Sequence, residues 1–304
     1  MKLKLKGLIA AVHTPMNDDF SVNYDVVSRQ AEHLASNGVA GVFVSGTTGE
    51  SLSLMTSERI KLFEVWGREA ERHGLVNVAH VGGNCLPDAQ EMVRAAEANG
   101  AVAISAMAST FFKPNDEEVL CDWFSEMIKP APNLPFYFYD IPSMTGVSVN
   151  TAAFMSIAEE RLSGFAGIKF TNPDLDMLKR CMSHETVNID ILFGTDERLI
   201  EGLALGCVGG VGSTYNFAAP LYLRIIEAYN RGDFDAANAD QARSVKMIKR
   251  MYKSGFGGAC KAAVKFAGVD CGPVRPPITR LKKDEEVALR SDLEAMGFFD
   301  WALK

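Results

Sequence analysis

Residues 136–170 read FYFYDIPSMTGVSVNTAAFMSIAEERLSGFAGIKF and contain the pattern that decides the fold. Two dense apolar runs, 136–139 and 164–170, flank a segment at 150–158 that is predicted to be helical. Parallel strands buried on both faces are apolar throughout, and a crossover helix usually connects them. The stretch therefore predicts one strand–helix–strand unit of a parallel sheet.

The same unit recurs in both directions along the chain. Strands are expected at 7–12, 41–44, 76–81, 101–106, 136–139, 164–170, 189–193 and 208–211, and a helix is expected after each. Eight such units of roughly 25–35 residues are typical of a (β/α)8 TIM barrel. The helix after the fourth strand is expected to start at Asn115, which has the spacing of a capping box with Glu118.

An open, doubly wound sheet would show the same local pattern. The dinucleotide-binding form of that sheet carries G-x-G-x-x-G after its first strand, whereas this strand ends in His13-Thr14-Pro15. The count of eight units and a helical remainder favour the barrel. We therefore predict an α/β fold, with a TIM barrel that carries the active site over residues 1–232 and a C-terminal helical extension, packed on it, over 233–304.

Composition excludes several classes of function. The 304 residues include 31 Lys+Arg and 38 Asp+Glu, a formal net charge of −7. Binding to nucleic acid or to an anionic membrane surface needs a positive field, so neither partner is expected. The six cysteines form no C-x-x-C pair, and no apolar stretch approaches the roughly 20 residues of a membrane span. We expect a cytoplasmic protein with reduced thiols and a small-molecule substrate.

Polar residues follow five of the expected strands. In a TIM barrel the chemistry takes place at the carboxyl ends of the strands, where the next loops begin. The five stretches are GTTGES at 46–51, YDIP at 139–142, IKFT at 168–171, GTDE at 194–197 and GSTYN at 212–216. They are expected to converge on one end of the barrel.

Lys169 is the most informative of these residues, because the rest of its strand is apolar. A lysine at a strand end can extend its ammonium group into water. A lysine that faces the barrel interior is desolvated instead, which favours the neutral amine and lowers its pKa. A neutral amine can attack a carbonyl and form a Schiff base, so Lys169 is predicted to be catalytic.

Residues at the neighbouring strand ends each have two interpretations. Tyr139 is either a core aromatic or a phenol that transfers protons beside the amine. Thr47 and Thr48 are either turn residues or, with their backbone N–H groups, a binding site for a carboxylate.

The last two strand ends are equally open to two interpretations. Asp196 and Glu197 either complement the dipole of the following helix, with Thr195 as its N-cap, or accept hydrogen bonds from substrate hydroxyls. Ser213 by itself is a weak signal and is either an ordinary turn serine or a functional residue.

Two other chemistries are disfavoured. The glycine-rich run at 206–212 lies where many barrels bind phosphate, but Asp196 and Glu197 would repel a phosphate nearby. The five histidines show no H-E-x-x-H motif or paired ligand spacing, so no metal is expected. Without a metal, a lysine iminium is the natural electron sink.

As a set, the strand ends resemble those of the lysine-dependent pyruvate aldolases, the family that includes dihydrodipicolinate synthase and N-acetylneuraminate lyase. The residues that carry the resemblance are GTTGE at 46–50, YDIP at 139–142, GIK at 167–169 and the segment 206–216, in the family's order. The resemblance spans essentially the whole chain. It implies a class I aldolase that forms its Schiff base through Lys169, needs no cofactor and assembles as a homotetramer.

Within this family the chain resembles the sialic-acid-cleaving branch. Asp196 and Glu197 match the acidic pair that holds the polyhydroxy tail, and residues 212–216 match that branch's sequence after the last strand. Met144 stands where the synthases carry an arginine for a second carboxylate. The resemblance implies reversible cleavage of N-acetylneuraminate to N-acetylmannosamine and pyruvate.

The resemblance also implies roles for individual residues. Lys169 and Tyr139 are the expected catalytic residues. The expected substrate-binding residues are Thr47 and Thr48 for the C1 carboxylate, Thr171 near the C4 hydroxyl, and Gly194, Asp196, Glu197 and Ser213 for the remaining hydroxyls.

Two residues depart from the family pattern. Thr47 replaces a serine frequent in bacterial lyases, and Phe112 replaces a tyrosine that in many members reaches the neighbouring subunit's site. Two alternatives to the lyase are retained. One is another pyruvate-dependent aldolase or dehydratase of the same family, either dihydrodipicolinate synthase-like or specific for another keto sugar acid. The other is a catalytically silent barrel that serves as a binding module.

Overall fold

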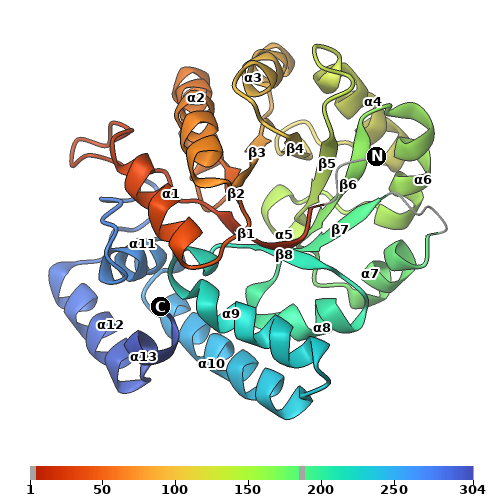
Figure 1. Cartoon of the computed structure of the whole chain (residues 1–304). Helices are drawn as coiled ribbons and strands as arrows, with labels where there is room; N and C mark the ends of the chain where they lie inside the picture. The colour runs from red at the N-terminus through yellow and green to blue at the C-terminus, as the bar shows by residue number, and fades with distance from the viewer. Residues whose placement is uncertain (1–4, 185–188, 304) are drawn as a thin grey trace.

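The computed structural model of the chain describes residues 5–184 and 189–303, and it contains a closed barrel of eight parallel strands (Figure 1). The strands pair in sequence order, and β8 closes the barrel against β1. They are β1 (Gly7–Ala11), β2 (Gly41–Val44), β3 (Val76–His80), β4 (Ala103–Met107), β5 (Phe136–Asp140), β6 (Phe165–Phe170), β7 (Asp190–Phe193) and β8 (Gly209–Gly212). The predicted TIM barrel is confirmed.

Helices surround the strands, as Figure 1 shows. They are α1 (Val26–Ser36), α2 (Thr56–His73), α3 (Leu86–Ala98), α4 (Glu117–Ile128), α5 (Pro142–Thr145), α6 (Thr151–Arg161), α7 (Leu175–Met182), α8 (Leu199–Ala204) and α9 (Tyr215–Asn230). Two single-turn 3-10 helices, η1 (Ser51–Ser53) and η2 (Asp196–Arg198), follow β2 and β7. Within the described ranges, no helix combines the length and apolarity needed to cross a bilayer.

The strands are buried on both faces, which explains why they are apolar throughout. One apolar cluster fills the barrel interior and includes Ile9, Phe43 and Tyr137. A second, larger cluster lies between the strands and the helices and includes Leu8 and Ile168. Alternate residues of a strand thus enter different cores.

Residues 231–303, the rest of the described chain, contain four helices beside the barrel. They are α10 (Phe234–Tyr252), α11 (Phe256–Phe266), α12 (Lys283–Ala295) and α13 (Phe298–Trp301). In Figure 1 these blue helices lie next to α9 and α1. The helix α10 packs against α9, α8 and η2, so it also approaches the loop that follows β7.

The predicted start of the fourth helix is wrong by two residues. The N-cap is Asp116 and not Asn115, because the Asp116 backbone is extended and its carboxylate accepts a hydrogen bond from the Val119 N–H at 2.8 Å. The helix α4 then begins at Glu117, with acidic residues in its first turn.

Candidate active site

A β-bulge turns Lys169 toward the barrel interior. In the pairing of β5 with β6, Phe136 lies opposite Phe165 and Tyr137 lies opposite Gly167, so Ala166 is an extra residue in β6. Phe165 and Ile168 both pack toward the helices, whereas Ala166 packs inside the barrel. Without the extra residue, Lys169 would share the outward face with Phe165, because strand side chains alternate with a period of two.

The Lys169 amine is enclosed by aromatic rings. Its side chain is 3 % exposed, and Nζ lies 3.8 Å from the ring centre of Tyr139 and 4.0 Å from that of Phe43. Burial lowers the pKa of Lys169 to about 7, although the Asp196 carboxylate acts in the opposite direction. The interpretation of Lys169 as a strand-end lysine that reaches bulk water is therefore wrong.

Tyr139 lies directly opposite Lys169 in the pairing of β5 with β6. Its hydroxyl is 3.3 Å from the Thr47 hydroxyl, which places the end of β2 beside the amine. Burial raises the pKa of Tyr139 to about 12, so the phenol carries its proton at neutral pH. A protonated phenol next to a neutral amine can donate a proton to a group that forms on that amine.

All nine predicted site residues line one cavity of about 450 Å³ at the carboxyl ends of the strands. They are Thr47, Thr48, Tyr139, Lys169, Thr171, Gly194, Asp196, Glu197 and Ser213. The five polar strand ends do converge, as expected from the direction of the strands.

Asp196 is buried at the first position of η2 and fixes the loop after β8. Its Oδ2 accepts hydrogen bonds from the Thr214 backbone N–H at 2.9 Å and from the Thr214 hydroxyl at 2.6 Å. Burial raises the pKa of Asp196 to about 6. Thr195 is the N-cap residue of η2, as predicted, but its side chain makes no capping hydrogen bond.

Close packing explains the glycines at the ends of β7 and β8. A Cβ on Gly194 would lie 1.9 Å from the Thr171 hydroxyl, and one on Gly212 would lie 1.9 Å from Asp196 Oδ1. A Cβ on Gly209 would meet the backbone of Gly7 in the neighbouring strand. Steric demands of the barrel and of Asp196 thus account for these glycines without a phosphate ligand.

Some buried polar atoms of the cavity lining lack hydrogen-bond partners among the described residues. They include Nε2 of His13, at the end of β1, and Oδ1 of Asp196. Burial lowers the pKa of His13 to about 3, so its ring is neutral. Buried polar atoms are normally paired, so these two atoms are available to water or to a polar ligand that enters the cavity.

The C-terminal helices also contribute to this cavity, which no motif in the sequence predicts. Lining residues from that part of the chain are Ile248, Tyr252, Phe256, Gly257, Cys260, Val274 and Ile278. They form a largely apolar wall opposite the polar strand ends. No local motif marks them, because an apolar helix face predicts burial but not what it is buried against.

The charges of the lining are mainly acidic. Lys169 is the one lysine or arginine among the described lining residues, which also include Glu50, Asp196 and Glu197. Met144, in α5, contributes an uncharged side chain. No group of three histidine, cysteine or carboxylate side chains within the described ranges is arranged to hold a metal ion.

Phe112 lies away from this cavity. Its side chain is 85 % exposed in the single chain and packs edge-to-face on Phe111, with ring centres 5.0 Å apart. Since it carries no hydroxyl, it adds no proton donor to any site that it reaches.

Known proteins with a similar sequence and fold show the family of this chain. Residues 4–296 match the model of the dihydrodipicolinate synthetase family. The chain belongs to that family. N-acetylneuraminate lyase from Gallus gallus is 35 % identical to this chain, and the alignment covers 98 % of each of the two chains. N-acetylneuraminate lyase from Rattus norvegicus is 34 % identical, and the alignment covers 99 % of this chain and 95 % of the rat chain. The solved structure of Proteus mirabilis N-acetylneuraminate lyase superposes with a TM-score of 0.94, at 36 % identity over 97 % of this chain and all of that one.

Proposed function

We propose that this chain is a Schiff-base aldolase that cleaves N-acetylneuraminate reversibly to N-acetylmannosamine and pyruvate. The observation that carries the proposal is the buried Lys169 amine, with its pKa near 7, beside Tyr139 in a cavity whose other charges are acidic. That amine is a nucleophile at neutral pH, and the iminium formed from it is an electron sink.

The reaction begins when the neutral Lys169 amine attacks the C2 ketone of the open-chain sugar. Tyr139 donates a proton to the departing C2 oxygen, which leaves as water and gives the protonated imine. The Tyr139 phenolate left by this step then accepts the proton of the C4 hydroxyl, the C3–C4 bond breaks, and its electron pair enters the iminium to form an enamine. N-acetylmannosamine leaves as the aldehyde, C3 takes up the proton from Tyr139, and water hydrolyses the imine to pyruvate and free Lys169.

The other lining residues bind and orient the substrate. Thr47 and Thr48, with their backbone N–H groups, hold the C1 carboxylate next to Lys169. Thr171 contacts the C4 hydroxyl, and the polyhydroxy tail is bound by Gly194, Asp196, Glu197 and Ser213. This positioning is part of the catalytic rate enhancement.

The charges of the cavity favour a monocarboxylate with a neutral tail. Carboxylates at Asp196 and Glu197 accept hydrogen bonds from hydroxyls but repel a second substrate carboxylate. The uncharged Met144 offers no countercharge for one. The cavity therefore fits a keto sugar acid better than the two carboxylate-bearing substrates that a dihydrodipicolinate synthase joins.

We further propose that the enzyme is a cytoplasmic homotetramer and that it uses no cofactor beyond the covalent imine at Lys169. The absence of C-x-x-C pairs and the family resemblance support these assignments.

Borohydride trapping tests the proposed function. Pyruvate or N-acetylneuraminate with borohydride is expected to give a permanent mass adduct on Lys169, because reduction converts the imine to a stable secondary amine. The Lys169→Ala variant is expected to form no adduct and to lose turnover at least about a thousandfold. A wild-type protein without an adduct would be a binding module. A protein that forms an adduct with pyruvate and with another keto sugar acid, but none with N-acetylneuraminate, would be a related aldolase or dehydratase.

A further inference from the structure

Glu50 has a strained backbone at the end of the turn that follows β2. Its φ angle is 62°, and that of Ser45, at the start of the same turn, is 57°. Residues other than glycine rarely adopt this left-handed conformation, and it persists only where the surroundings hold it in place. Thr47 and Thr48 lie between these two strained residues.

The Glu50 carboxylate is held by two groups from the C-terminal part of the chain. Its Oε1 forms an ion pair with Lys261 Nζ at 2.8 Å, and its Oε2 accepts a hydrogen bond from the Arg275 backbone N–H at 2.7 Å. The side chains of Glu50 and Lys261 are only 2 % and 3 % exposed. Lys261 Nζ also donates to the Pro273 carbonyl at 2.6 Å.

Both partners of Glu50 adjoin the wall of the substrate cavity. Cys260 precedes Lys261 on α11, and Val274 precedes Arg275; both Cys260 and Val274 line the cavity. One carboxylate therefore connects the turn that carries Thr47 and Thr48 to two segments of the opposite wall.

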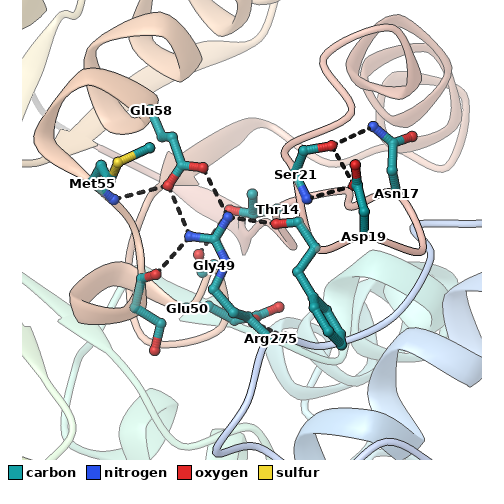
Figure 2. A network of polar contacts seen from close by, with 11 residues as sticks. Thr14, Asn17, Asp19, Ser21, Gly49, Glu50, Met55, Glu58 and Arg275 are labelled. Carbon is teal, nitrogen blue, oxygen red and sulfur yellow. Dashed lines mark hydrogen bonds and ion pairs between the residues drawn. The ribbon is translucent and has the colours of Figure 1, made fainter.

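A second, separate anchor holds the same C-terminal segment. As Figure 2 shows, the Arg275 guanidinium binds Glu58 through two hydrogen bonds, each of 2.8 Å. It also donates to the Ser53 carbonyl at 2.7 Å. Glu58 lies on α2 outside the cavity lining, and its carboxylate binds the Arg275 side chain, whereas Glu50 binds the Arg275 backbone; Glu58 therefore attaches the C-terminal segment without itself contacting residues 45–50.

We propose that Glu50 is a positioning residue, which fixes the carboxylate-binding turn against the C-terminal wall of the cavity. A buried ion pair by itself contributes little net stability, since desolvation of the two charges offsets their attraction. Here the pair maintains a strained backbone whose neighbours Thr47 and Thr48 hold the substrate carboxylate. The inference rests on the proposed function for the identity of that ligand.

Glu50→Gln tests this inference, with Glu58→Gln as the matched control. Both changes remove one charge from a carboxylate that binds the C-terminal segment. Glu50→Gln is expected to raise KM for N-acetylneuraminate, and the half-saturating pyruvate concentration in borohydride trapping, about tenfold or more. It is also expected to accelerate amide hydrogen exchange at residues 47–50. Both variants are expected to lower Tm by similar amounts. Only Glu58→Gln is expected to leave KM within about twofold of wild type.

Lys261→Met approaches the same contact from the other side and keeps the test available if Glu50→Gln does not fold. It is expected to reproduce the higher KM and the faster exchange at 47–50. If the variant that folds loses Tm but retains the wild-type KM and exchange, the ion pair only stabilises the fold and the inference is wrong. If wild type forms no pyruvate adduct, the proposed function fails, and the exchange data alone decide the role of Glu50.

Discussion

The protonation of Lys169 sets the pH range in which the proposed chemistry can proceed. Its pKa is lowered to about 7 by burial, so the ammonium predominates below pH 7 and the amine above it. Only the amine is nucleophilic. We therefore expect kcat/KM for cleavage to fall about tenfold per pH unit below pH 7 and to level off above it.

The measurement is kcat/KM from about pH 5 to pH 9, together with the rate of pyruvate trapping. A lysine with an ordinary pKa would instead give a rate that still rises toward pH 10. Such a profile would contradict the burial of the amine as the cause of its reactivity.

Gly212 illustrates how one hydrogen atom in place of a methyl group leaves room for the Asp196 carboxylate in the cavity lining. In Gly212→Ala the new Cβ would lie 1.9 Å from Asp196 Oδ1, so the carboxylate must move. Forced displacement of this kind costs about 1–3 kcal/mol, and we expect KM for N-acetylneuraminate to rise about tenfold or more. Gly83→Ala is the control, because its Cβ would meet its nearest neighbour only at 3.9 Å. An unchanged KM in Gly212→Ala would show that Asp196 does not hold the substrate.

At the scale of elements, β6 shows where sequence analysis succeeds and where it stops. The apolar run at 164–170 predicts a buried strand with Lys169 near its end, and the structure confirms both. The direction of Lys169 depends on the bulge at Ala166, which exists only in the pairing with β5. The side-chain alternation of an isolated strand does not contain that information, because register is a property of two strands.

The helix α10 contributes a wall to the end of the cavity that contains Asp196 and Glu197. Tyr252 lines the cavity and stacks on Phe256 with ring centres 4.5 Å apart. The helix α10 packs against η2, which carries Asp196 and Glu197, and partial burial together with the Glu197 carboxylate raises the pKa of Tyr252. In Tyr252→Ala we expect KM for N-acetylneuraminate to rise roughly fivefold, corresponding to about 1 kcal/mol of lost contact.

Pyruvate trapping is expected to be unchanged in Tyr252→Ala, because pyruvate occupies only the Lys169 end. Phe234→Ala is the control, because Phe234 and Tyr252 are both half-exposed aromatic residues of α10. Phe234 packs on the Tyr229 ring and lies outside the cavity lining. A loss of pyruvate trapping in Tyr252→Ala would contradict the division of the cavity into two ends.

At the scale of the whole molecule, eight local patterns sufficed to predict the closed barrel. Each unit has a short apolar strand and a helix, and only a few architectures bury both faces of eight parallel strands. The contacts that complete the cavity are not local in sequence: Glu50 and Lys261, for example, lie more than 200 residues apart. Such contacts follow from the path of the C-terminal helices over the barrel, which local sequence does not specify.

The buried amine that gives the proposed activity also lowers the stability of the whole fold. Lys169 has a pKa of about 7 in the folded protein and an ordinary lysine pKa of 10.5 in the unfolded chain, so between these two pH values the unfolded chain binds more protons. Stability then rises with pH through this range, and the penalty is fully present below pH 7. We expect Lys169→Met, which keeps the volume and removes the charge, to raise the free energy of unfolding by about 4 kcal/mol at pH 7 and about 2 kcal/mol at pH 9.

Urea unfolding of wild type and Lys169→Met at both pH values measures this difference. Lys249→Met, at an exposed position of α10, controls for the replacement of an ammonium group by a thioether. A gain that stays constant with pH would mean that packing of the methionine, and not removal of a desolvated amine, stabilises the variant. If the difference in free energy of unfolding between Lys169→Met and wild type shrinks toward pH 10, the desolvated amine that makes Lys169 reactive also lowers the stability of the protein.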